Sequence, residues 1–123
     1  MLKRELRDRK KAQKEALFFR EISNLFVRIR LDDKELEDFS ITKVHLSSDK
    51  SICTVYFYVL KGKEYFEKKL QHLILYKPSI RRSLSQTLAV RRVPDLRFKF
   101  DHTVAKQHKV ADLLDKVKTE ESS

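Results

Sequence analysis

Pro78 interrupts a run of apolar residues at helical spacing, and it constrains the fold more than any other residue in the chain. The apolar residues lie on both sides of the proline, as Phe66, Leu70, Leu73 and Ile74 before it and Ile80, Leu84 and Leu88 after it. A proline inside a helix donates no backbone hydrogen bond and clashes with the preceding turn. We therefore expect two helices joined by a kink at Lys77-Pro78-Ser79, with Ser79 as the N-cap of the second helix.

The sequence before this helix pair shows first a helical and then a strand periodicity. Between Lys14 and Leu31 an amphipathic helix is predicted, with a buried stripe of Phe18, Ile22, Leu25, Phe26 and Ile29. An acidic loop, residues 32–38, follows. Residues 39–46 and 51–60 are rich in β-branched and aromatic residues, and turn-forming residues separate them, which predicts a β-hairpin. Gly62 ends the second strand, and the next helix begins near Lys63.

After Pro94 the sequence predicts a third strand and a final helix. Apolar and basic residues alternate in the strand, as Leu96, Arg97, Phe98, Lys99 and Phe100. The strand therefore has an apolar side and a cationic side. Either Asp101 or Thr103 is placed to cap the last helix. That helix has a short apolar stripe of Val110, Leu113, Leu114 and Val117.

The composition is typical of one domain with one core. The chain has 123 residues, of which 41% are hydrophobic, including 8 Phe and 4 Tyr. This is enough apolar side chain to form a core without disulfides or a metal. We expect Cys53, the lone cysteine, to lie in that core. Tyr56 and Tyr58 alternate with the apolar residues of the second strand, and we expect them to pack rather than to stack on bases.

No segment indicates export or membrane insertion. The N-terminus lacks the charged, apolar and small-residue regions of a signal peptide, and no window approaches the roughly 18 apolar residues of a membrane span. A cysteine without a partner is typical of a reducing compartment. We therefore expect a soluble cytoplasmic protein.

The positive charge is confined to two stretches. The net charge is +10, yet residues 1–30 carry 10 Lys or Arg against 4 acids and residues 77–99 carry 7 against 1. The rest of the chain is slightly acidic. This confinement favours a polyanionic partner, most commonly a phosphate backbone, because each neutralised phosphate releases a counterion. A solvated basic surface is the alternative.

The residues of a catalytic centre are missing from the sequence. His102 and His108 fall on different sides of a helix, and Cys53 has no second cysteine with which to form a zinc site. A single glycine excludes a phosphate-binding loop and a dinucleotide fingerprint. We therefore expect a protein that is not an enzyme and uses no cofactor and no metal.

The order helix, strand, strand, helix, kink, helix, strand resembles a type II KH domain, a fold that binds RNA. A more specific resemblance, to the ribosome-binding factor A family, lies in one stretch. It comprises Ile80, Arg81, Leu84, Leu88, the run Val90-Arg91-Arg92-Val93-Pro94-Asp95-Leu96, Phe98 and Asp101. Looser agreement at Arg28, Ile29, residues 41–44 and Asp49 extends the resemblance to roughly Leu17–Leu114. We expect a single α+β, KH type II-like domain: a three-stranded sheet with helices packed on one face, plus a C-terminal helix.

The resemblance implies a bacterial maturation factor that binds the free or immature small ribosomal subunit. The contact would be with rRNA near the 3′ end and the neck, during late assembly and rRNA processing. A small-subunit assembly GTPase as a second partner, and a monomeric state, are implied in the same way. The division expected is a basic arm or helix extension over residues 1–13, the RNA-binding domain over residues 14–117, and a polar tail over residues 118–123.

The chain departs from the family at the kink. There the family usually has a small residue followed by glycine, whereas this chain has Lys77 and Pro78. Glycine allows a close approach of backbone to phosphate, but proline has no N–H. RNA contact at this point would therefore shift to Lys77 and Ser79. The chain also lacks the GXXG loop of KH proteins in general.

The candidate RNA-binding residues form three groups. They are Lys77, Ser79, Arg81 and Arg82 at the kink, Arg91, Arg92, Arg97 and Lys99 around the third strand, and Arg20 and Arg28 on the first helix. Each group also has an alternative role that does not involve RNA. Arg81 or Arg82 would pair with Glu64 or Glu67, Arg92 would hold the turn before Pro94, and the other cations would be merely solvated.

A second function, protein binding instead of RNA binding, is also compatible with this sequence. A basic protein-interaction module would recognise acidic segments of other proteins with the same cations. Salt dependence does not separate the two functions, because both are electrostatic.

Overall fold

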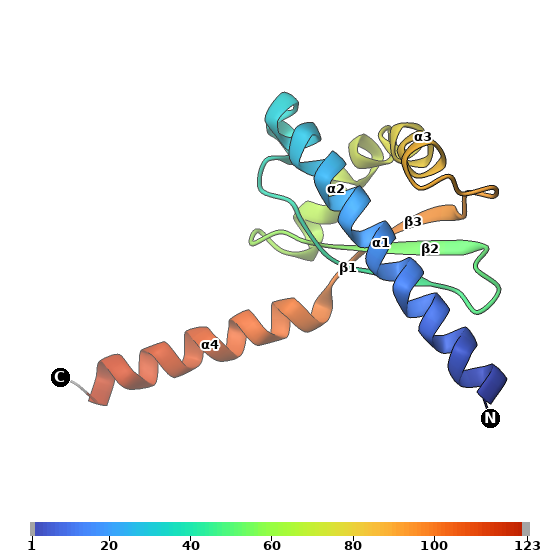
Figure 1. The fold of residues 1–123 in the computed structure, drawn as a ribbon. Helices are drawn as coiled ribbons and strands as arrows, with labels where there is room; N and C mark the ends of the chain where they lie inside the picture. Colours follow the sequence, from blue (N-terminus) through green and yellow to red (C-terminus); the bar gives the residue numbers. More distant parts are fainter. Residues whose placement is uncertain (1, 122–123) are drawn as a thin grey trace.

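The computed structural model describes residues 2–121, and the side chains of residues 2–115 (Figure 1). The elements are α1 (Leu2–Asp32), a 3-10 turn η1 (Lys34–Leu36), β1 (Ser40–Leu46), β2 (Ile52–Tyr58), α2 (Lys63–Ile74), α3 (Lys77–Thr87), β3 (Asp95–Phe100) and α4 (His102–Glu121). Their order is the one predicted from the apolar periodicities. No helix in this described part of the chain is both long enough and apolar enough to cross a membrane.

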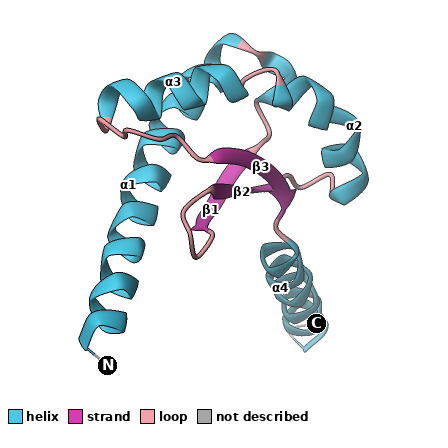
Figure 2. Cartoon of the chain, turned by 90° about the vertical axis from the view of Figure 1, so that its right-hand side faces the viewer, coloured by secondary structure: helices cyan, strands magenta, loops and turns pink. Residues whose placement is uncertain are grey.

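The sheet has the order β1-β2-β3, with β1 antiparallel and β3 parallel to the central β2. Helices α1, α2 and α3 cover one face (Figure 2). The opposite face, called the open face below, is not covered by these helices, although His108 of α4 stacks on Tyr58 at one end of it. On β2 the residues Cys53, Val55 and Phe57 are fully buried. Since strand side chains alternate, Thr54, Tyr56 and Tyr58 belong to the open face. The predicted α+β fold is thus confirmed, and the strand order is added to it.

Phe57 lies at the centre of the core. Its ring contacts Phe26 of α1 at 5.4 Å, Phe98 of β3 at 5.1 Å and Phe66 of α2 at 6.2 Å between ring centroids. Two of these contacts are edge-to-face, the arrangement that aromatic quadrupoles favour. One side chain of the middle strand therefore joins three other elements.

The break between α2 and α3 lies earlier than the sequence predicted. Helix α2 ends at Ile74, and Tyr76, not Ser79, is the N-cap of α3. Pro78 falls in the first turn of α3, where an N–H has no partner within the helix and proline is tolerated. The predicted kink at Lys77-Pro78-Ser79 and the Ser79 cap are therefore wrong, because the proline begins the second helix instead of separating the two.

Both terminal helices extend beyond the sheet (Figure 1). Helix α1 is continuous from Leu2, so residues 2–13 form a helix extension. At the other end Asp101, and not Thr103, caps α4, because its Oδ1 accepts the N–H groups of Thr103 and Val104 at 2.9 and 3.2 Å. Three residues of the apolar stripe on α4, Val110, Leu113 and Leu114, remain more than half exposed. The stripe does not reach the core, and Val117 lies outside the described side chains.

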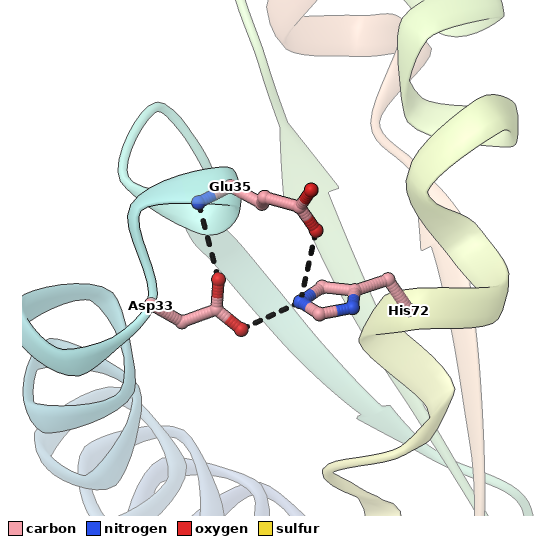
Figure 3. Close-up of side chains that lie close together, drawn as sticks. All are labelled: Asp33, Glu35 and His72. Carbon is pink, nitrogen blue, oxygen red and sulfur yellow. Dashed lines mark hydrogen bonds and ion pairs between the residues drawn. The ribbon is translucent and has the colours of Figure 1, made fainter.

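Asp33 attaches the end of α1 to α2 and to the break between α2 and α3. Figure 3 shows its contacts with Glu35 and His72. Its Oδ1 accepts the N–H of Glu35, and its Oδ2 accepts the hydroxyl of Tyr76 at 2.6 Å and contacts Nε2 of His72 at 2.5 Å. The Tyr76 hydrogen bond, with His72 and Glu35, holds the pKa of Asp33 below its ordinary value of 3.8. The same bond raises the pKa of Tyr76 to about 12.

Replacing Phe98 by Ala should lower the free energy of unfolding by about 3 to 5 kcal/mol, the usual range for a buried Phe. The side chain is 8% exposed and packs edge-to-face on Phe57. Urea denaturation measures the change, and Phe19→Ala, at 37% exposure on α1, is the matched control. A loss for Phe98→Ala no larger than for the control would contradict the packing of β3.

Replacing Asp33 by Asn should cost about 1 kcal/mol at neutral pH, because Asn still caps η1 but the charge-assisted bonds to Tyr76 and His72 are lost. The folded pKa of Asp33 is lowered, so its contribution is fully present above the ordinary value of 3.8 and lost as the pH falls through the folded pKa. Wild type and Asp33→Asn should therefore converge in stability below pH 3.8. Urea denaturation over a pH series tests this, with the exposed Asp32→Asn as control. A constant difference at every pH would show that the charge of Asp33 is unimportant.

Candidate nucleic-acid interface

Eight of the ten candidate residues line a chain of adjoining hollows around α1 and α3. One hollow of about 350 Å³ lies between the two helices and is lined by Arg28, Ser79 and Arg82. The next, of about 410 Å³, shares Arg82 with it and adds Lys77 and Arg81. Folding thus brings the end of the first basic stretch against the start of the second. A hydrogen bond of 2.7 Å from the Ser83 hydroxyl to Glu21 joins the two helices there.

The largest hollow, of about 940 Å³, lies between the first half of α1, the β1–β2 turn and the loop after α3. Arg91 and Arg92 line it, together with Lys14 and Lys50, which the sequence did not single out. Ala89 has a positive φ of 51° in this loop, at a position after the helix end that commonly adopts the left-handed conformation. Lys14 and Lys50 come from distant segments, so no local pattern could have indicated them.

Shared lining residues make these hollows one surface, which we call the α1–α3 surface. Val93 borders both the 410 Å³ and the 940 Å³ hollow, and Leu17 joins the latter to a hollow of about 490 Å³ that contains Arg20. The described lining includes nine cationic side chains and two carboxylates, Asp49 and Asp95. The Ser51 hydroxyl and backbone N–H, with the Ser47 hydroxyl, hydrogen-bond Asp49 and lower its pKa to about 2. Asp49 is therefore negatively charged at neutral pH. Nine cations against two carboxylates still give the surface a strong positive excess.

The arginines of α3 do not pair with the acids of α2. Glu67 pairs with Lys63 at 3.8 Å, and no ion pair among the described residues involves Arg81, Arg82 or Glu64. Arg81 instead donates to the backbone oxygen of Val93 at 3.4 Å. This bond holds the loop before Pro94, the role that the sequence left open for Arg92. Arg81 and Arg82 are both exposed, in the second turn of α3.

Arg97 and Lys99 lie elsewhere, on the open face of the sheet. They alternate with buried Leu96, Phe98 and Phe100, as predicted. Arg97 is in register with Thr54, and Lys99 with Tyr56. Lys43 of β1, which the sequence did not single out, pairs with Tyr56 from the other side. The ten candidates therefore divide between two surfaces, separated by the sheet.

A cluster of three side chains with metal-ligand spacing and the free cysteine both lie outside these two surfaces. Asp33, Glu35 and His72 offer three ligand atoms within 4.8 Å of one another, the spacing of a metal site. Asp33 and His72 are already bonded to each other and Asp33 also to Tyr76, so the geometry is explained by the packing of η1 on α2. Cys53 is buried, and burial raises the pKa of its thiol to about 12. A protonated, buried thiol is inert as a nucleophile.

The family model for ribosome-binding factor A matches residues 10–114. The ribosome-binding factor A of Lactobacillus gasseri is 34% identical over 108 residues, which are 87% of each chain. A crystal structure of ribosome-binding factor A from Thermus thermophilus is 27% identical, covers 72% of this chain and 92% of its own, and has a TM-score of 0.61.

One further solved structure and one fitted homology model are similar. A Thermotoga maritima protein solved by NMR has the same fold, at 22% identity, a TM-score of 0.63, and coverage of 72% of this chain and 84% of its own. A homology model of the Thermus thermophilus ribosome-binding factor A, fitted into the cryo-EM map of its complex with 30S, is 25% identical. Its TM-score is 0.53, and it covers 68% of this chain and 87% of its own. With the family model spanning most of the domain and a curated relative above 30% identity, this chain belongs to the ribosome-binding factor A family.

Proposed function

We propose that this protein is a maturation factor of the small ribosomal subunit. It binds the free or immature subunit, contacting rRNA near the 3′ end and the neck during late assembly and rRNA processing. The family membership supports this function, as does the relative that was fitted into a 30S complex. The observation on this chain that carries the proposal is the α1–α3 surface, where two basic stretches distant in sequence meet around adjoining hollows.

The proposed mechanism is recognition of shape and backbone charge. Exposed arginines on a rigid helix pair form bidentate contacts with phosphates and release counterions when they bind. The proposed contacts are Lys77, Ser79, Arg81, Arg82, Arg91, Arg92, Arg20 and Arg28 on the α1–α3 surface, with Arg97 and Lys99 on the open sheet face. Pro78 exposes its ring in the first turn of α3, so side chains rather than backbone N–H groups make the contact there.

The remaining parts of the proposal follow from the family. Residues 14–117 are the RNA-binding domain, residues 1–13 a basic extension and residues 118–123 a polar tail. The protein acts as a cytoplasmic monomer, and a small-subunit assembly GTPase promotes its release. The basic extension lengthens α1, so it carries its cations on a helix beyond the sheet (Figure 1).

The double substitution Arg81→Glu and Arg82→Glu should weaken binding to purified small subunits by roughly tenfold or more, because two phosphate contacts become repulsive. It should also reduce the slope of log Kd against log salt concentration by about 2. The matched control is Lys106→Glu with Lys109→Glu, which makes the same charge change on the exposed face of α4. Filter binding over a salt series measures both quantities, and circular dichroism checks the fold. Equal losses in the two double variants would show that net charge, not the α1–α3 surface, determines binding.

A nuclease experiment separates RNA binding from recognition of acidic protein segments. Subunits stripped of loosely held proteins should bind the wild type before nuclease treatment and lose it afterwards. Binding that survives complete digestion of the rRNA would favour the protein-interaction module and refute the proposed function.

A further inference from the structure

We propose that the open face of the sheet is a second RNA site, on which an unpaired base stacks against Tyr56 between Lys43 and Lys99. The inference rests on the proposed function in one respect, that RNA is the partner. It adds a second binding surface, names the ring on which a base stacks, and specifies that the RNA bound there is single-stranded.

The register of the sheet places the three residues in one row. Tyr56 lies on the central strand, opposite Lys43 on β1 and Lys99 on β3. Nζ of Lys43 lies 4.5 Å from the centroid of the Tyr56 ring, and both lysines are exposed. A phosphate on either side of a stacked base would therefore meet a cation within the span of neighbouring strands.

The face has a net positive charge. The next row adds His45 and Arg97 on either side of Thr54. The acids on this side are Asp95, at the start of β3 where it also borders the α1–α3 surface, and Asp101, which is buried and accepts the hydroxyl of Thr42 at 2.6 Å. Burial raises the pKa of Asp101, but the Thr42 hydrogen bond, the backbone N–H groups of α4 and the charge of Lys43 together lower it below its ordinary value. Lys43, Arg97 and Lys99 form no ion pair with any described residue.

The two tyrosines of β2 differ in their surroundings. Tyr58 stacks on His108 of α4 at 4.9 Å and 9°, and contacts Phe100 at 5.9 Å. Tyr58 therefore packs, as the sequence predicted. Tyr56 makes no contact with another ring among the described residues, and Nζ of Lys43 lies over it. The half-buried Tyr56 also lines a hollow, so part of the residue is accessible to a ligand.

A hollow of about 520 Å³ extends from Tyr56 to β3 and α2. Phe98, Phe100 and Leu70 provide apolar lining, and Lys99 provides a cation. Lys63 and Glu67 also line the hollow, but they pair with each other at 3.8 Å. Its volume is within the range of ligand pockets in proteins. An aromatic and aliphatic lining with a lysine beside it matches a nucleobase and its phosphate.

Single-stranded RNA is the occupant that this chemistry favours. Sheet aromatics in RNA-binding modules stack on unpaired bases, and a base within a duplex has no free face to offer. An acidic peptide would use the lysines and arginine but would leave the Tyr56 ring without a role. The ring between the cations therefore distinguishes the two partners.

The test measures binding of a short fluorescein-labelled oligouridylate by fluorescence polarisation. Tyr56→Ala should weaken binding by at least about fivefold, the lower end of the usual effect of losing one stacked base. Tyr56→Phe keeps the ring and should bind like the wild type. Tyr56→Ala should leave the salt dependence unchanged, whereas Lys43→Gln with Lys99→Gln should reduce the slope of log Kd against log salt by about 1.4, because each phosphate contact on a single strand contributes about 0.7.

A second measurement does not depend on the variants folding. Titration of wild-type protein with the oligouridylate should move the ring proton signals of Tyr56 upfield in NMR spectra, through the ring current of the stacked base, while those of Tyr65 on α2 stay in place. Unmoved Tyr56 signals at saturation would overturn the inference, and so would equal affinity of Tyr56→Ala and wild type. Equally tight, Tyr56-independent capture of an oligoglutamate peptide would overturn it in favour of an acidic protein.

The outcomes separate this inference from the proposed function. Arg81→Glu with Arg82→Glu should impair subunit binding more than oligouridylate binding, since the two surfaces lie on opposite sides of the sheet. A wild-type protein that binds subunits but not the oligouridylate would refute the second site alone. Oligouridylate binding without subunit binding would refute the maturation function and leave the stacking site standing.

Discussion

The packing of Phe57 is the constraint on which the rest of the structure depends. The ring is fully buried on the middle strand and contacts aromatic rings from α1, α2 and β3. Because strand side chains alternate, burying Phe57 also directs Cys53 and Val55 toward the helices and Tyr56 toward the open face. A shift of β2 by one residue would exchange the two faces, so the core and the outer surface are determined together.

The same core explains why charges distant in sequence become neighbours. Helices α1 and α3 each bury an apolar stripe above the sheet, with Phe26 and Ile80 among the residues that enter the core. Their basic residues remain at the surface, since burying an unpaired charge is costly. Two amphipathic helices packed side by side therefore present their cations on one surface. The α1–α3 surface is a consequence of hydrophobic packing combined with the exclusion of charge from the core.

The break between α2 and α3 shows how the chain accommodates a proline at the junction of two consecutive helices. Pro78 lies in the first turn of α3, where it replaces no intrahelical hydrogen bond. From outside the helix, Asp33 holds this turn by accepting the Tyr76 hydroxyl. Within the helix, the Ile80 N–H donates to the Tyr76 backbone oxygen at 3.0 Å, which closes the first turn of α3. Pro78 has no N–H to offer, and the cations that line the same hollow are Lys77, Arg81 and Arg82.

The sequence by itself determined the order of helices and strands, the buried side of α1, α2, α3 and the strands, and the confinement of positive charge, because periodicity is carried by residues that are neighbours in the chain. The apolar stripe of α4 is the exception, since its described residues remain exposed. It therefore predicted Cys53 and Phe98 as core residues and the cationic side of β3. Only the tertiary structure decided the strand order, the helix break at Leu75-Tyr76 and the division of the candidate cations between two surfaces. It also added Lys14, Lys43 and Lys50, whose neighbours come from distant segments. Such pairings depend on how whole faces pack, and Asp33 and Tyr76, 43 residues apart, meet only when α1 and α2 lie on the same sheet.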